Sequence, residues 1–225
     1  MNLSLLGTTI FLLQFQGLKS CVEEERAALL RYKALIESEG YHADHLLPSW
    51  IDDPLSNCCG WERVTCNSST ARVIQLSLRN SRPFASDGVR NSLWYVDLAL
   101  FQPFVDLNTL DLSSNTIGGW IQNHGLESYL RLEQLEMLDL SYNFLNKSSL
   151  EQLSALTSLK SLDLRANNMG EALNWQEKLY PYLESRETIP VQELSVFESL
   201  DKLDLSSNAL RDSPLTAQSK QPYNL

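Results

Sequence analysis

Four cysteines carry the clearest chemistry in the sequence, and all lie in its first third: Cys21, Cys58, Cys59 and Cys66. Adjacent cysteines fit poorly as two ligands of one tetrahedral zinc ion, and no C-x-x-C pair is present. An even number of cysteines instead favours disulfides. Four cysteines allow three pairings, and a bond between the neighbours Cys58 and Cys59 would close a strained ring. The spacing therefore favours Cys21–Cys58 together with Cys59–Cys66.

The remaining reactive residue types show no catalytic arrangement. The motifs G-x-S-x-G, H-E-x-x-H, G-x-G-x-x-G and the P-loop are all absent. His42 and His45 stand three apart but lack a third metal ligand, so we expect them at the surface. Trp50 and Trp61 flank the adjacent cysteines and are expected to pack rather than to bind a ligand. We predict no enzyme activity, no metal centre and no cofactor.

The overall charge excludes some partners. The chain has 225 residues, of which 18 are basic and 28 acidic, giving a formal net charge of −10 and a pI near 4.8. Nucleic acid and anionic membrane surfaces would repel such a protein. Because 43% of the residues are hydrophobic, the chain can still build a substantial core.

Residues 3–13 form the only long apolar run of the sequence. Its length matches the hydrophobic region of a secretory signal peptide and is too short to span a bilayer. We predict a signal peptide over residues 1–20. No later segment reaches the ~18 apolar residues of a transmembrane helix, so no membrane span is expected in the rest of the chain.

Residues 23–37, between the first two cysteines, are predicted to form an amphipathic helix. Ala27, Leu30 and Ala34 recur at helical spacing and are expected to share one apolar stripe, with Leu29 and Ile36 beside it. Residues 23–25 are three glutamates, which suit a solvated first turn because negative charge complements the helix dipole there.

A repeat begins at residue 107. The pattern L-x-x-L-x-L-x-x-N, which is the leucine-rich-repeat signature, occurs four times. Residues 73–78 resemble one further strand of the same kind. No repeat can bury its leucines alone, so neighbouring repeats must stack into a solenoid. The repeated asparagines are expected to satisfy backbone groups where the chain leaves each strand: Asn115, Asn143, Asn167 and Asn208.

The residues between the leucines should face the opposite, concave side of the sheet, because side chains alternate along a strand. They form a column of four aspartates: Asp111, Asp139, Asp163 and Asp204. Stacked aspartates could attract a basic ligand, although L-D-L is also a common spelling of the repeat. Four residues differ in chemical character from the aspartates and small polar residues that dominate this face. Together with one aspartate, they are the ligand-contact candidates: Met137, Asp139, Tyr142, Arg165 and Lys202.

Four stretches carry a resemblance to a known family. Residues 23–30 (EEERAALL) and 58–66 (CCGWERVTC) resemble the plant leucine-rich-repeat N-terminal cap, and the L-D-L-S-S-N spellings at 110–115 and 203–208 resemble plant receptor-like proteins. The resemblance implies an α/β fold: a right-handed leucine-rich-repeat solenoid with a short parallel concave sheet and a disulfide-stapled N-terminal helical cap. It also implies a non-catalytic module in cell-surface signalling or defence, which binds extracellular peptides or proteins and signals through a partner receptor kinase.

The expected organisation and location follow from this resemblance. The expected units are a signal peptide (1–20), the cap (21–80), the repeats (81–210, with an insert at about 170–188) and a tail (211–225). The protein is expected to be secreted, extracellular or in the cell wall, or at the plasma membrane if the natural product is a longer receptor. Two alternatives stay open. One is a secreted inhibitor of a cell-wall hydrolase, similar to polygalacturonase-inhibiting proteins, and the other is a non-functional gene fragment.

Two further features concern the surface. Asn67 and Asn146 begin N-x-S sequons, which predict N-glycosylation of a secreted chain.

The tail lacks capping cysteines, so we expect the edge of the last repeat to need a cover.

Overall fold

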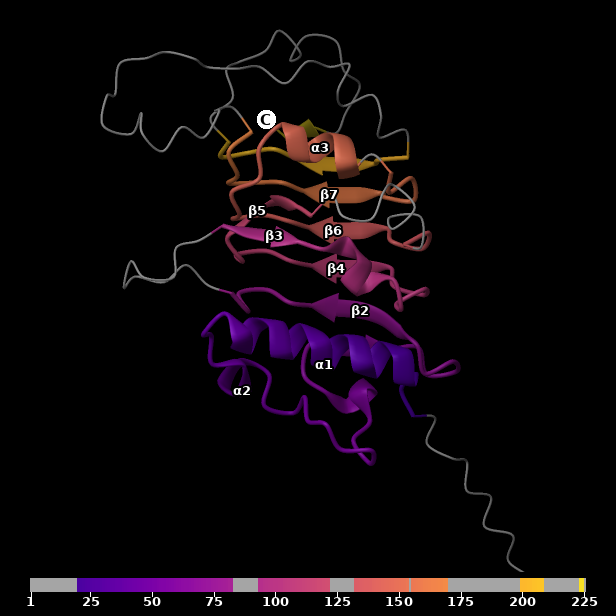
Figure 1. The fold of residues 1–225 in the computed structure, drawn as a ribbon. Helices are drawn as coiled ribbons and strands as arrows, with labels where there is room; N and C mark the ends of the chain where they lie inside the picture. The colour runs from indigo at the N-terminus through magenta and orange to yellow at the C-terminus, as the bar shows by residue number, and fades with distance from the viewer. Residues whose placement is uncertain are drawn as a thin grey trace, which may run out of the picture.

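The computed structural model describes residues 20–82, 93–121, 132–153, 155–169, 199–208 and 223–224. The short strands of the repeats stack one above another in chain order and form a curved solenoid, with the cap at its amino-terminal end (Figure 1). The signal segment, the insert at 170–188 and most of the 211–225 tail lie outside the described residues.

The main sheet has seven strands in the order β1-β2-β4-β6-β7-β8-β9. Only β1 is antiparallel to its neighbour, and the other pairs are parallel. The strand bounds are β1 Val64–Cys66, β2 Val73–Ser77, β4 Thr109–Asp111, β6 Met137–Asp139, β7 Ser161–Asp163, β8 Lys202–Asp204 and β9 Tyr223–Asn224. The strand predicted at residues 73–78 is therefore confirmed as β2.

The leucines of the repeats form the core. Leu110 and Leu138 in the strands, and Leu112 and Leu140 just after them, are each no more than 4% exposed. Met137, by contrast, faces outward and is 46% exposed. This alternation confirms the predicted assignment of leucines to the inside and intervening residues to the concave face.

The predicted role of the repeated asparagines is also confirmed. The Asn143 amide group donates to the carbonyls of Leu112 and Leu140, both at 3.0 Å. Its carbonyl oxygen accepts the backbone N–H groups of Asn115 (2.9 Å) and Ile117 (3.0 Å). Each such asparagine therefore satisfies buried backbone groups of its own repeat and of the preceding one, which locks neighbouring repeats together.

The cap contains the helices α1 (Glu23–Ser38) and α2 (Ala43–Leu46) and a 3-10 turn, η1 (Cys58–Gly60). Trp50 and Trp61 are buried and stacked, with ring centroids 5.7 Å apart, as predicted. His42 and His45 are exposed.

The helix over residues 23–37 is confirmed. Leu29 and Ile36, predicted beside the apolar stripe, are buried, but the stripe itself is not the packed face. Ala34 is exposed, and Ala27 and Leu30 are only partly buried. The packed face instead carries Ala28, Leu29, Tyr32 and Ile36, with three charged residues that have specific partners: Glu25, Arg26 and Lys33. The prediction of a fully solvated first turn is likewise wrong for Glu25.

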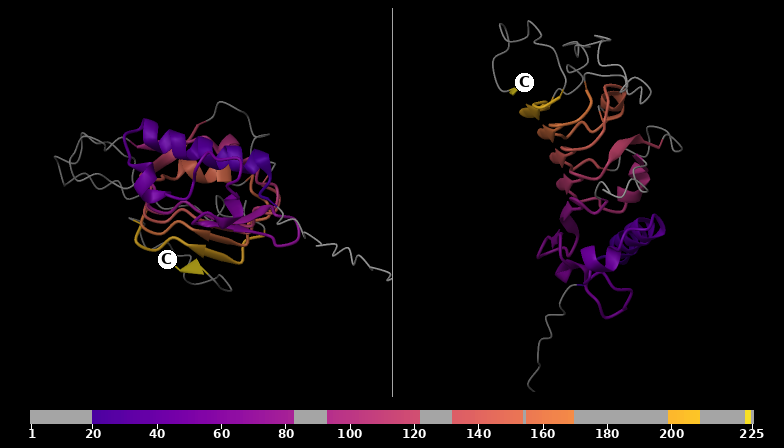
Figure 2. Two further views of the ribbon diagram at one scale, coloured as in Figure 1. Left: turned by 90° about the horizontal axis from the view of Figure 1, so that it is seen from below. Right: turned by 90° about the vertical axis from the view of Figure 1, so that its left-hand side faces the viewer.

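A second layer lies on the side of the solenoid opposite the main sheet (Figure 2). It contains α1, the helix α3 (Ser148–Leu153) and a small parallel sheet of β3 (Trp94–Val96) and β5 (Ile117–Trp120), followed after β3 by the 3-10 turn η2 (Leu98–Phe101). The sequence pattern predicted neither β3 nor β5, because both strands lie outside the residues that carry the repeat signature.

The edge of β8 is occupied within the chain itself. Leu203 and Asp204 pair with Tyr223 and Asn224 of β9, near the end of the tail. The expected need for a cover at this edge is thus met, at least in part, by residues of the same chain.

Candidate functional site

The concave face of the main sheet is built from two columns of side chains in register. One column contains Gln75, Thr109, Met137, Ser161 and Lys202, and the other contains Ser77, Asp111, Asp139, Asp163 and Asp204. Sequence reasoning predicted the four aspartates, Met137 and Lys202 on this face but missed Gln75 and Ser77. The alternation of residues 73–78 could have identified both, because they occupy the same positions relative to buried residues of β2.

The aspartates first serve the turns that follow the strands. Asp139 accepts the backbone N–H of Ser141 at 2.9 Å, and Asp111 accepts both the N–H (3.0 Å) and the hydroxyl (2.7 Å) of Ser113. The other oxygen of Asp111 accepts the Ser77 hydroxyl at 3.0 Å. One oxygen of each of these two carboxylates thus stabilises the turn that follows its strand.

Arg165 neutralises the carboxy-terminal part of the aspartate column. Its guanidinium lies 2.8 Å from an Asp163 oxygen and 4.0 Å from an Asp204 oxygen. The same group lies over the ring of Tyr142, 5.9 Å from the centroid. Tyr142 itself is 56% exposed and has a positive φ of 56°, a conformation that the turn imposes before Asn143.

The two aspartates nearest Arg165 respond differently to their surroundings. Burial, with the charges of Asp139 and Asp204, raises the pKa of Asp163 despite its bond from the Arg165 N–H. For Asp204, burial acts in the same direction, but hydrogen bonds from Ser206 and the nearby positive charges outweigh it and lower its pKa. Although both carboxylates lie near Arg165, only Asp204 therefore holds its negative charge more strongly than an ordinary aspartate does.

The five contact candidates fall into two groups. Tyr142 and Arg165 meet where the chain leaves β6 and β7, and Asp139 lies in the aspartate column beside them. Met137 and Lys202 share the other column, but β7 lies between their strands, so the structure does not bring these two side by side.

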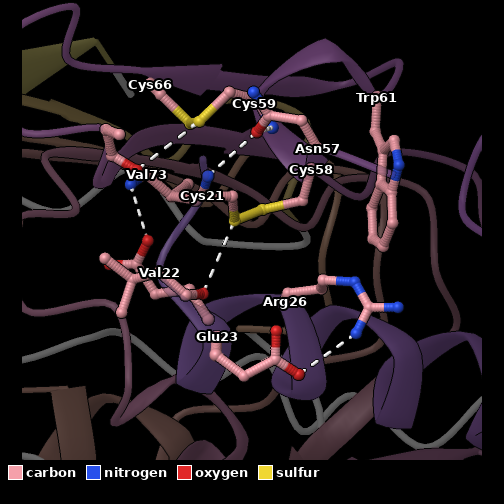
Figure 3. Close-up of a disulfide and its surroundings, with 12 residues drawn as sticks. Cys21, Val22, Glu23, Arg26, Asn57, Cys58, Cys59, Trp61, Cys66 and Val73 are labelled. Carbon is pink, nitrogen blue, oxygen red and sulfur yellow. Dashed lines mark hydrogen bonds and ion pairs between the residues drawn. A yellow bond between two sulfur atoms is a disulfide. The ribbon is translucent and has the colours of Figure 1, made fainter. Parts of the chain in front are cut away.

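The cysteines pair as the spacing favoured, Cys21 with Cys58 and Cys59 with Cys66 (Figure 3). Asn57 lies beside both bonds, and its side-chain oxygen accepts the backbone N–H groups of Cys21 (2.9 Å) and Cys59 (3.1 Å). This part of the cap is a stapled structural unit.

Both sequon asparagines are partly exposed. The side-chain oxygen of Asn67 accepts the Ser69 hydroxyl at 2.6 Å, and that of Asn146 accepts the Ser148 hydroxyl at 2.6 Å. Across the described ranges, no helix has the length and apolar character needed to cross a bilayer.

Comparison with known proteins places the chain among leucine-rich-repeat sequences. Residues 22–67 match the leucine rich repeat N-terminal domain. Receptor-like protein 9a of Arabidopsis thaliana is 38% identical over 199 residues, which cover 88% of this chain and 18% of that protein. Receptor-like protein 14 of the same plant is 35% identical over 218 residues, 91% of this chain and 22% of that protein. The chain thus spans about a fifth of the length of these curated relatives.

Solved structures show the same fold. The BIR2 ectodomain of Arabidopsis thaliana superposes with a TM-score of 0.53 at 22% identity, covering 89% of this chain and all of that one. The Arabidopsis receptor kinase HAESA, solved with the peptide hormone IDA and the co-receptor SERK1, has a TM-score of 0.51 at 20% identity, covering 84% of this chain and 30% of that one.

Proposed function

Because this chain belongs to the plant leucine-rich-repeat receptor-like proteins, over a segment about a fifth of their length, we propose that it is a non-catalytic recognition module for an extracellular peptide or protein. The proposal includes secretion to the extracellular space and signalling through a partner receptor kinase. HAESA, with the same fold, has been solved with a peptide hormone and a co-receptor, which supports this kind of partner by analogy of fold.

The observation that carries the proposal is the composition of the concave face. An ordered column of aspartates runs along it, and Tyr142 and Met137 stand out from it as exposed large apolar side chains. Arg165 already lies beside Asp163 and Asp204, so Asp139 is the place where a basic side chain of the ligand would add the most favourable charge interaction. The ring of Tyr142 offers a rigid apolar contact nearby.

The test is to select a displayed random-peptide library on the full chain, secreted from a plant host. We expect the retained peptides to be enriched in lysine and arginine. Asp139→Asn removes the charge but keeps the oxygen that accepts the Ser141 N–H, so it should weaken binding about tenfold without unfolding the protein. Tyr142→Ser should weaken it further.

Glu24→Gln is the matched control, because it removes one exposed acidic charge from α1, away from the concave face. Equal loss of binding in this control would mean that only the net charge matters. Retained peptides without basic residues would contradict the proposed ligand class. Capture of a cell-wall hydrolase that Tyr142→Ser abolishes would favour the inhibitor function instead.

A further inference from the structure

A pocket of about 750 Å³ lies between the cap and the first repeat, lined on one side by α1 and on the other by β3 and η2. This volume falls within the range of sites that enclose one small molecule. The elements that form it lie in the layer opposite the main sheet, so the pocket is separate from the concave face (Figure 2).

Part of the pocket lining is apolar. Leu35 contributes from α1, Leu100 from η2 and Ile121 from the residue after β5, and all three are only partly buried. Tyr95 of β3 also belongs to the lining and is 52% exposed. Aromatic and aliphatic side chains that remain accessible in a concave site favour an apolar ligand group, because its binding would remove their surface from water.

The acidic groups of the lining already have partners. Glu39 forms an ion pair with the buried Arg82, whose guanidinium also donates to the Thr116 hydroxyl at 2.7 Å. Asp97 accepts the N–H of Ala99 at 2.9 Å and so begins η2. These charges stabilise the walls of the pocket and are not available to attract a cationic ligand.

Arg31 differs from the other charged residues of the lining. It lies one helical turn before Leu35 on the same face of α1, is exposed, and makes neither an ion pair nor a hydrogen bond through its guanidinium in the described part of the chain. A guanidinium presents several N–H donors in a fork that matches a carboxylate. An apolar surface with one uncommitted arginine at its rim therefore matches an apolar acid.

We propose that this pocket binds a small aromatic carboxylic acid, with its ring against Leu35, Tyr95 and Leu100 and its carboxylate on the guanidinium of Arg31. Such a site would give the chain a second ligand, independent of the one proposed for the concave face.

The test is calorimetric titration of the full secreted chain with three probes. 2-Naphthoate carries the ring and the charge, 2-naphthalenemethanol carries the ring alone, and the tripeptide Gly-Gly-Phe carries an aromatic group and a carboxylate on a peptide. We expect saturable binding of 2-naphthoate, about tenfold tighter than of the alcohol, because a charge-assisted hydrogen bond is lost with the alcohol.

Three variants assign the binding to this pocket. Arg31→Gln should remove the preference for the acid over the alcohol and leave the affinity for the alcohol unchanged. Ala99→Trp should fill the pocket and abolish the binding of both naphthalene probes. Arg79→Gln, which changes an exposed arginine outside the pocket, should leave both affinities unchanged. The circular dichroism spectrum and melting temperature confirm that each variant is folded.

Several outcomes would overturn the proposal. If 2-naphthoate shows no saturable binding, or if its binding persists in folded Ala99→Trp, this pocket is not its binding site. If the unmodified chain binds the acid and the alcohol with equal affinity, Arg31 does not bind the carboxylate. Tighter binding of Gly-Gly-Phe than of 2-naphthoate would assign the pocket to a protein terminus. None of these results bears on the concave-face proposal, whose test uses different residues and a peptide library.

Discussion

The carboxylate of Glu25, in the first turn of α1, accepts the backbone N–H of Val73 at 2.9 Å and thereby joins the cap helix to β2. Glu25 is fully buried, and its other oxygen lies 3.5 Å from the guanidinium of Arg72. Burial raises the pKa of Glu25, with a smaller contribution from the charge of Asp106, although the Val73 N–H and Arg72 act in the opposite direction.

This raised pKa predicts a pH-dependent stability. The folded state holds the Glu25 proton more tightly than the unfolded state, so the stabilisation is fully present below the ordinary value of 4.5 and is lost as pH rises above it. Glu25→Gln stays neutral and should flatten this part of the profile. Urea unfolding of both proteins between pH 4 and about 7.5 measures the effect. Parallel profiles for the two proteins would contradict it.

Removing the carboxylate oxygens of Glu25 should destabilise the protein more than removing only its charge. Glu25→Ala leaves the buried Val73 N–H without its acceptor, and we expect a loss of about 1–3 kcal/mol in the free energy of unfolding at neutral pH. Glu24→Ala, at the exposed neighbouring position, is the control and should change this free energy little. Equal effects of the two substitutions would show that the Val73 bond is unimportant.

Asn143→Ala should strongly destabilise the solenoid. Asn143 is 4% exposed and bonds the backbone of two repeats, so the substitution leaves several buried groups unpaired, with an expected cost of about 3 kcal/mol or more. Asn208→Ala removes the equivalent bonds at a half-buried position, where water can replace them, and should cost less. Chemical denaturation compares the two, and the reverse order would contradict the argument.

The two glycines of β5 should differ in their tolerance of a methyl group. A Cβ on Gly118 would lie 2.9 Å from the Cβ of Leu93, so Gly118→Ala should cost about 1–3 kcal/mol through overpacking. A Cβ on Gly119 would lie 3.3 Å from the ring of the half-exposed Tyr95, which can move aside. Thermal unfolding should therefore show a larger decrease for Gly118→Ala, and similar melting temperatures would contradict the close packing of β3 on β5.

The sequons predict two N-linked glycans on protein secreted from a plant host. Asn67→Gln and Asn146→Gln should each lower the intact mass by one glycan, since both asparagines are partly exposed. Enzymatic removal of the glycans should then leave a mass consistent with two disulfides. A single unglycosylated species in the medium would contradict this prediction.

The sequence by itself determined the features that depend on spacing along the chain. The leucine period predicts which side chains enter the core, and the aspartate and asparagine columns then follow from stacking identical repeats. The cysteine spacing likewise favoured the observed pairing. These features are predictable because each repeat has the same local geometry as the next, so one rule of alternation applies to all strands.

Only the tertiary structure decided which face of α1 is buried. Apolar residues occur on several faces of this helix, so periodicity alone favoured the stripe of Ala27, Leu30 and Ala34, with Leu29 and Ile36 only beside it. The observed face includes the charged Glu25 and Lys33, and their partners are the N–H of Val73 and the carbonyl of Trp50. A charge can be buried only where such partners meet it, and elements distant in sequence supply them here. For the same reason no local pattern could reveal the pocket beside Arg31, whose two walls come together only when the cap packs on the first repeat.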